Sequence, residues 1–220
     1  MYNVIITGST GMIGKGALLA CLNSEEIQEV LLINRSSVGM ESPKIKELLL
    51  QDFTQVHEYS EQLKGYDACF HCMGVSALGM SEDKYHQLTF GVSKSLADTL
   101  FELNPDLVFC YVSGTGTDSS ENGRIMWARV KGKTENYILS LGFKKAYMFR
   151  PGFVLPEDGI KSKTKLYNTI YVLLTPFYSW IKNSKNVTTT RKIGKAMVHA
   201  LTKEFSKSLL ENKDINKLAE

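Results

Sequence analysis

The sequence has 220 residues, 43% of them hydrophobic and 22% charged, which is typical of one soluble globular domain large enough to bury a core without disulfides. A formal net charge of +3, with no basic stripe interleaved with aromatic residues, argues against nucleic-acid binding and favours at most an anionic ligand. Four cysteines in apolar or helical patterns indicate reduced thiols, and the absence of a leader-like or membrane-spanning apolar segment predicts a cytoplasmic protein.

Short apolar runs alternate with helical patterns along the chain. Helices are expected at 11–22, 81–103 and 123–141, the second of them capped by Ser81. The terminal stretch LLENKDINKLAE is expected to form a surface helix and a short end segment. This alternation predicts an α/β fold, a doubly wound Rossmann parallel sheet, in a single domain over 1–220. The runs expected to be buried strands are NVIIT, EVLLIN, KELLL, DACFHCM, DLVFCYVS and AYMFR.

A glycine-rich segment, TGSTGMIG, follows the first expected strand and leads into the first expected helix. Gly8 permits a tight turn, Gly11 lets a diphosphate approach the backbone, and Gly14 lets the helix pack closely on the sheet. The helix N-terminus also favours an anion. The alternative is a glycine turn that binds nothing, although its position and the following helix favour a dinucleotide. The residues predicted to contact the dinucleotide here are Gly8, Ser9, Thr10, Gly11, Met12, Ile13 and Gly14.

Residues at the ends of the second and third expected strands indicate whether NAD or NADP binds. NAD sites usually carry an acidic residue about twenty residues after the glycines, on the adenosine ribose. Here Asn34 does not repel a phosphate, and the guanidinium of Arg35 can pair with one at the 2′ position, so NADP is favoured over NAD. The alternative for Arg35 is an ordinary exposed arginine. Asp52, followed by Phe53, is expected either to meet the adenine amino group or to cap a turn.

An ordered set of motifs continues from the glycine turn through most of the chain. CMG at 72–74 follows the fourth expected strand, YVSGTG with Ser113 follows the fifth, the helix with Trp127 and Lys131 comes next, and FRPG at 149–152 follows the sixth. In this order they resemble the atypical and extended short-chain dehydrogenase/reductases, which include NAD-dependent epimerase/dehydratase-like proteins. The resemblance implies that Ser113 donates a hydrogen bond to the substrate oxygen and that Lys131 holds the nicotinamide ribose. The remaining contacts it implies around the nicotinamide are Cys72, Met73, Gly74, Pro151, Gly152 and Val154.

The tyrosine that this family uses to exchange a proton with the substrate is replaced by Trp127. Such general acid–base catalysis contributes about 10² to 10⁴ in rate. An indole N–H donates a hydrogen bond but does not ionise near neutrality, so Trp127 is expected to shape the pocket without carrying the proton. Tyr178 and Lys182 have the family's spacing, but they follow the sixth expected strand, which indicates coincidence. The side chains considered as replacement acids are Tyr85, His86, Thr115 and Asp118.

Two further features have competing interpretations. Cys69, His71 and Cys72 contain metal-ligating atoms, but on a strand the third faces away from the first two, so a metal site is not expected. The aromatic segment 166–181 is interpreted as a substrate-side helical pair or an oligomer contact more readily than as a membrane-surface segment. By the family resemblance, it lies within a lid at 153–190.

The leading hypothesis is an NADP(H)-dependent oxidoreductase acting on a small organic substrate, with Ser113, Lys131 and Trp127 at the reacting end and an unidentified proton donor. The alternative is a non-catalytic NADP(H)-binding protein that reports redox state to a protein partner. The substrate and the oligomeric state are not encoded in any motif of the sequence.

Overall fold

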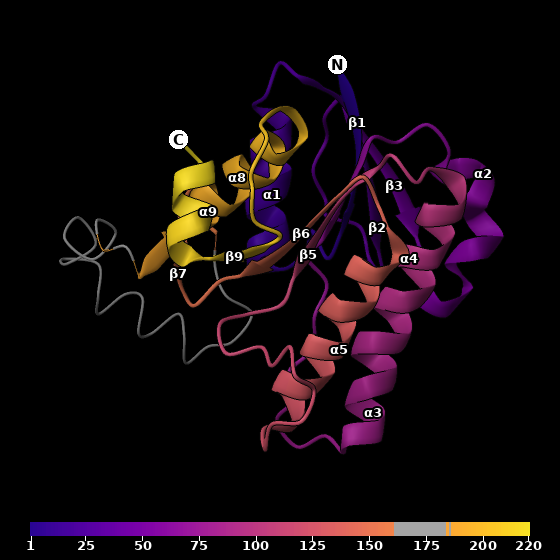
Figure 1. Ribbon diagram of the computed structural model, residues 1–220. Helices are drawn as coiled ribbons and strands as arrows, with labels where there is room; N and C mark the ends of the chain where they lie inside the picture. The colour runs from indigo at the N-terminus through magenta and orange to yellow at the C-terminus, as the bar shows by residue number, and fades with distance from the viewer. Residues whose placement is uncertain (161–183, 185) are drawn as a thin grey trace.

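The computed structural model describes residues 1–160, 184 and 186–220, and a seven-stranded parallel sheet forms its centre (Figure 1). The strand order is β3-β2-β1-β4-β5-β6-β9, and every neighbouring pair is parallel. This order confirms the expected doubly wound fold, since the chain moves outward in opposite directions from β1 and from β4, and ligands of such folds bind where the direction reverses. The strands are β1 (Tyr2–Thr7), β2 (Ile27–Asn34), β3 (Ile45–Leu49), β4 (Ala68–His71), β5 (Val108–Val112), β6 (Lys145–Arg150) and β9 (Leu209–Glu211).

Helices cover both faces of the sheet, which explains why its central strands β1, β4 and β5 are apolar with little alternation, whereas the edge strand β3 is largely exposed (Figure 1). In β1, Val4 and Ile6 pack into one hydrophobic cluster and Ile5 into the other, and all three are fully buried. Burying one such side chain stabilises the fold by about 1.5 to 3 kcal/mol. The first face carries α1 (Met12–Leu22), α8 (Thr190–Thr202) and α9 (Asn212–Leu218); the second carries the 3-10 turn η1 (Phe53–Tyr59), α2 (Ser60–Leu63), α3 (Glu82–His86), the π turn η2 (Gln87–Gly91), α4 (Val92–Leu103) and α5 (Met126–Leu141).

The three expected helices are present, with one boundary shifted. The hydroxyl of Ser81 accepts from the amide of Lys84 at 3.4 Å, which confirms the expected cap of α3. The helix expected from residue 123 begins three residues later, at Met126. The reason is that the carboxylate of Asp118 accepts from the amide of Gly123 at 2.6 Å and so holds these residues in a loop.

The C-terminal segment was only partly predicted. Residues Leu209–Glu211 form β9 and pair with β6, in the register Phe149↔Leu210. The helix α9 follows, but Ile215 and Leu218 are buried against the sheet, so this is not a surface helix. A run of three residues is too short to reveal a strand by its pattern, because the hydrogen bonds that define it come from β6.

The described parts of the expected lid form a separate pair of parallel strands, β7 (Phe153–Leu155) and β8 (Val187–Thr189). The aromatic segment 166–181 lies outside the described residues, and so does the pair Tyr178 and Lys182. Across the parts of the chain that the structure describes, no helix combines the length and apolar character needed to span a bilayer.

Candidate cofactor and substrate cleft

The glycine-rich loop between β1 and α1 is tightly folded. Gly8 has a positive φ of 72°, and the amide of Gly11 donates to the Gly8 carbonyl at 2.9 Å. A Cβ on Gly14 would lie 2.3 Å from that carbonyl oxygen, and one on Gly8 would lie 2.8 Å from the backbone of Met73. The loop therefore needs glycine at both positions. Gly11 is the N-cap residue of α1 and makes no side-chain cap hydrogen bond to the first-turn N–H groups.

Asn34, at the end of β2, is buried and braces this loop. Its Oδ1 accepts from the amide of Ser9 at 3.1 Å, and its Nδ2 donates to the Ser9 hydroxyl at 2.7 Å. Both ends of the Asn34 amide are therefore used inside the protein. Asn34 therefore serves a ligand site in two ways. It holds the loop in shape through Ser9, and it places no negative charge that would repel a phosphate.

The loop is one end of a cleft made of three adjoining hollows over the carboxyl ends of the strands. The loop hollow, of about 170 Å³, is lined by Arg35 and Gly74, and the central hollow, of about 630 Å³, by Gly74 and Lys131. The tryptophan hollow, of about 490 Å³, is lined by Lys131 and Trp127. Shared lining residues make the cleft continuous. The residues predicted for the cofactor that line it are Gly8, Thr10, Gly11, Met12, Ile13, Asn34, Arg35, Phe53, Cys72, Met73, Gly74, Lys131, Pro151, Gly152 and Val154.

Arg35 and Asp52 have different surroundings at the loop end. Arg35 is exposed, and among the described residues no carboxylate pairs with its guanidinium, so this cation is available at the rim of the loop hollow. The carboxylate of Asp52 accepts from the amide of Thr54 at 2.9 Å and from its hydroxyl at 2.7 Å. These hydrogen bonds lower the pKa of Asp52. Of the two interpretations of Asp52, the structure shows the turn cap.

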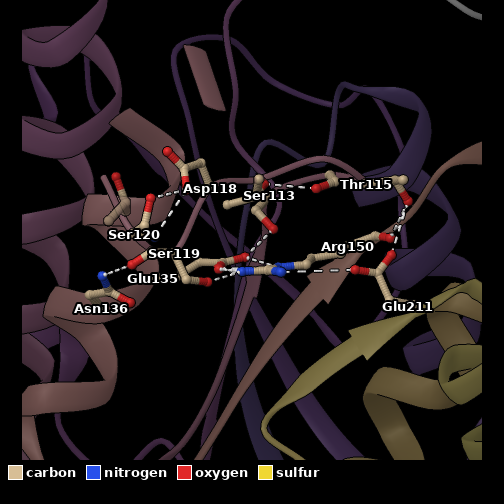
Figure 2. A network of polar contacts seen from close by, with 12 residues as sticks. Ser113, Thr115, Asp118, Ser119, Ser120, Glu135, Asn136, Arg150 and Glu211 are labelled. Atoms are coloured by element: carbon tan, nitrogen blue, oxygen red, sulfur yellow. Dashed lines mark hydrogen bonds and ion pairs between the residues drawn. The ribbon is translucent and has the colours of Figure 1, made fainter. Parts of the chain in front are cut away.

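Ser113 lines the central hollow just after the end of β5, and its hydroxyl is engaged inside the protein. It donates to Oε1 of Glu135 at 2.5 Å (Figure 2). A hydroxyl has one proton, so a hydrogen bond from Ser113 to a substrate would require this contact to break. The orienting role predicted for Ser113 therefore depends on a rotation of its side chain.

Glu135 is a fully buried carboxylate that sequence reasoning missed. The guanidinium of Arg150 donates through Nε to both Glu135 oxygens, at 3.0 and 3.2 Å, which raises the pKa of Arg150 (Figure 2). Arg150 also donates to the hydroxyl of Ser119 at 2.5 Å and lies 3.9 Å from the carboxylate of Glu211. The signal in the sequence was spacing, because Glu135 follows Lys131 by one helical turn on the same face.

Lys131 reaches from α5 to the junction of the central and tryptophan hollows. Its ammonium donates to the backbone carbonyl of Ser113. Burial lowers the pKa of Lys131 to about 8, while the negative charge of Glu135 opposes that shift. Among the described residues that line these two hollows, Lys131 is the one with a charged side chain.

Trp127 lies one turn before Lys131 and forms a wall of the tryptophan hollow. Its ring packs beside the 114–117 loop, where a Cβ on Gly116 would lie 3.5 Å from the indole. The same hollow is also lined by Leu78, which is 92% exposed, and by Tyr85, which is 1% exposed. Tyr85 is therefore a buried core residue that also borders the hollow.

The other three candidate acids have structural partners. The hydroxyl of Thr115 donates to the carbonyl of Arg150 at 3.0 Å, and Asp118 holds the loop before α5. The ring of His86 packs on Phe90 with centroids 4.8 Å apart, and burial lowers its pKa. None of the three lines the tryptophan hollow.

His71 is buried among hydrogen-bond partners. One ring nitrogen lies 2.6 Å from the hydroxyl of Thr7, and the other lies 2.8 Å from the hydroxyl of Ser93. Both nitrogens are therefore already used. Among the described residues, no group of three metal-ligating side chains converges.

The sequence pattern of the NAD dependent epimerase/dehydratase family matches residues 4–134, more than half of the chain, including the glycine-rich loop and Lys131. The chain belongs to this family. The match confirms the family-level resemblance drawn from the motifs.

Two curated relatives are distant. The mitochondrial protein FMP52 of Meyerozyma guilliermondii is 24% identical over 154 residues, which cover 70% of this chain and 65% of the relative. The protein HTATIP2 of Rattus norvegicus is 26% identical over 155 residues, covering 70% of this chain and 63% of the relative. The matched part of the chain thus spans just under two thirds of each relative's length.

Solved structures of the same fold include WbmF of Bordetella bronchiseptica, in complex with NAD⁺, with a TM-score of 0.70 at 13% identity. That match covers 99% of this chain and 76% of WbmF. A short chain dehydrogenase of Burkholderia cenocepacia, in complex with NADP, has a TM-score of 0.69 at 11% identity, covering 96% of this chain and 87% of that one. These likenesses show the fold.

The prediction of a cytoplasmic protein is contradicted by the relatives. FMP52 proteins of several fungi are named as mitochondrial. The prediction rested on the absence of a recognisable leader and of a spanning segment, and neither feature distinguishes between compartments inside the cell.

Proposed function

We propose that this protein binds NADP(H) along the cleft and transfers hydride between it and a small organic substrate. The observation that carries the proposal is the continuity of the three hollows, because it links the glycine-rich loop to Lys131 and Trp127. A dinucleotide is an extended molecule with a diphosphate near its middle, and such a cleft suits it.

The residues present fit a dinucleotide. A Cβ on Gly74 would meet no protein atom within 4 Å, so it would stand in the cleft where a ligand would lie. The uncapped start of α1 suits the diphosphate, and Arg35 at the rim suits a 2′-phosphate, which favours NADP over NAD. Lys131 would hold the nicotinamide ribose. The bound nicotinamide would supply the hydride.

The tryptophan hollow suggests the class of substrate. Its described lining is mainly apolar, with Val75, Leu78, Met126 and Trp127 and few polar groups. A largely apolar compound with one carbonyl or hydroxyl group fits this lining, because burial of apolar surface favours binding and unpaired polar groups oppose it.

A specific observation favours a second candidate, a non-catalytic NADP(H)-binding sensor. The order of the motifs assigns Trp127 to the position of the family's proton-transferring tyrosine, and an indole does not ionise near neutrality. In this second function the cofactor binds and dissociates unchanged, and a protein partner responds to the bound form.

Calorimetry with NADP⁺ and NAD⁺, followed by loss of NADPH absorbance with apolar aldehydes and quinones, separates the two functions. Turnover on any of these compounds supports the oxidoreductase. Tight binding without turnover supports the sensor, and in that case Trp127→Tyr tests the cause. Activity created by this variant would identify the missing acid as the reason for silence, whereas failure to bind either dinucleotide would refute both functions.

A further inference from the structure

Lys131 is placed to do more than hold a ribose. An ammonium has three N–H donors, and one is used by the carbonyl of Ser113. The side chain borders both the central hollow, where the proposed nicotinamide would lie, and the tryptophan hollow, where the proposed substrate would lie. One donor can therefore bind the ribose while another faces the substrate oxygen.

We infer that Lys131 itself gives the proton to the substrate oxygen, in place of the family's tyrosine, whose position the motif order assigns to Trp127; this rests on the proposed function. As the carbonyl carbon accepts hydride from the reduced nicotinamide, the π electron pair moves to the oxygen. That oxygen takes a proton from the ammonium of Lys131, which becomes a neutral amine and is reprotonated from water. Oxidation of an alcohol follows the reverse path, with the amine as base.

The surroundings of Lys131 favour a proton donor that works near neutrality. General acids are most effective when their pKa lies near the working pH, and burial brings the pKa of Lys131 to about 8. Glu135 on its own helix is the charge that acts on Lys131, and Arg150 from β6 acts through Glu135, while Tyr85 from α3 and Cys72 after β4 line the same hollows. Glu135 keeps the ammonium protonated, and Arg150 balances the charge of Glu135.

Tyr85 is the competing donor, since its side chain also lines the tryptophan hollow. Burial raises the pKa of Tyr85, which makes its phenol a weaker acid. Tyr85 also lines neither the central hollow nor the loop hollow. Lys131 borders both ends of the proposed transfer and is the better placed of the two.

Variants distinguish donor from ribose holder. Lys131→Arg keeps a positive charge and N–H donors but cannot release a proton near neutrality, whereas Tyr85→Phe removes only the phenolic hydroxyl and keeps the ring. With phenanthrenequinone as the probe, we expect Lys131→Arg to bind NADPH within about threefold of the parent protein and to lose about 10² or more in kcat. The matched control is Lys133→Arg, at an exposed position of the same helix outside the three hollows, and it should change kcat by less than about threefold. Retained kcat in Lys131→Arg, or a hundredfold loss in Tyr85→Phe, would overturn the inference.

A second readout needs no turnover. In protein labelled with ¹³C at lysine Cε, the resonance absent from Lys131→Arg identifies Lys131, and its titration in the native protein is compared with the urea-unfolded chain. A native midpoint well below the unfolded one supports the donor role, and equal midpoints overturn it. If the parent protein binds NADPH but reduces no probe, the proposed function fails and the donor role fails with it. If the parent protein reduces the probe and Lys131→Arg reduces it equally fast, the proposed function stands and the donor role alone fails.

Discussion

At the scale of single residues, one carboxylate organises the reacting end of the cleft. Glu135 is fully buried and holds both the hydroxyl of Ser113 and the guanidinium of Arg150 (Figure 2). It also adds negative charge beside Lys131. Because a buried charge is costly without partners, the three side chains depend on one another.

Glu135→Gln should destabilise the protein by about 3 kcal/mol, because the guanidinium of Arg150, 11% exposed, would lose its buried partner. Glu211→Gln is the matched control, since Glu211 is 41% exposed and lies 3.9 Å from Arg150. We expect a change below about 1 kcal/mol for the control. Urea unfolding at pH 7 measures both, and equal losses would contradict this account of Glu135.

Arg35→Ala should weaken NADP⁺ binding by about 10- to 100-fold and leave NAD⁺ binding nearly unchanged, because NAD⁺ lacks the 2′-phosphate that the guanidinium would meet. Arg191→Ala is the control, as Arg191 pairs with Asp158 away from the cleft. Calorimetry with both dinucleotides measures the effect. A parallel loss for NAD⁺ would show that Arg35 has a structural role instead.

At the scale of elements, α1 and α8 touch through glycines. A Cβ on Gly16 would lie 2.5 Å from the carbonyl oxygen of Thr190, and one on Gly194 would lie 2.4 Å from that of Gly16. Real side chains do not approach backbone so closely, so the two helices would have to separate. This contact fixes α1, and with it the glycine-rich loop at its start.

Gly194→Ala should therefore destabilise the protein by about 1 to 3 kcal/mol through overpacking. Gly91→Ala is the matched comparison, because Gly91 is helical, with φ −57°, and its Cβ would meet no atom within 4 Å. That variant should gain about 0.5 to 1 kcal/mol from the lower backbone entropy of its unfolded chain. Thermal unfolding of both variants tests the opposite signs, and two losses of equal size would refute the packing argument.

At the scale of the whole molecule, His71 couples stability to pH. It lies in the central strand β4, bonded on both sides to Thr7 and Ser93, and burial lowers its pKa from 6.5 to about 3. The unfolded chain binds a proton below pH 6.5 while the native protein does not bind it until about pH 3. Stability from this group is therefore present above pH 6.5 and falls as the pH drops toward 3.

Between pH 7 and pH 5 the free energy of unfolding should fall by about 2 kcal/mol from this residue. His71→Gln should remove most of the slope, and His57→Gln, at an exposed position, should keep it. Urea titrations at several pH values measure the slope. An unchanged slope in His71→Gln would assign the pH dependence to other groups.

Much of the fold and part of the site could be predicted from local patterns. Apolar runs and helical periodicity identified the sheet and its helices, because residues buried on both sides must be apolar. The glycines of the first loop were identified by position, and most of the residues predicted for the cofactor do line the cleft. Two features were missed. The start of α5 at Met126 depends on the hydrogen bond between Asp118 and Gly123 in the preceding loop, and strand β9 exists because it pairs with β6 at the edge of the sheet.

The sequence by itself determined a doubly wound sheet, a glycine-rich turn before a helix and an indole one turn before Lys131. Only the tertiary structure decided where the hydroxyl of Ser113 points, that Asn34 braces the loop, and that Asp52 caps a turn. The physical reason is the separation along the chain between the residues that interact. Propensity and periodicity act between neighbours in the chain, whereas the direction of a polar side chain depends on partners that folding brings from far away, as Glu135 is brought to Ser113 and Arg150.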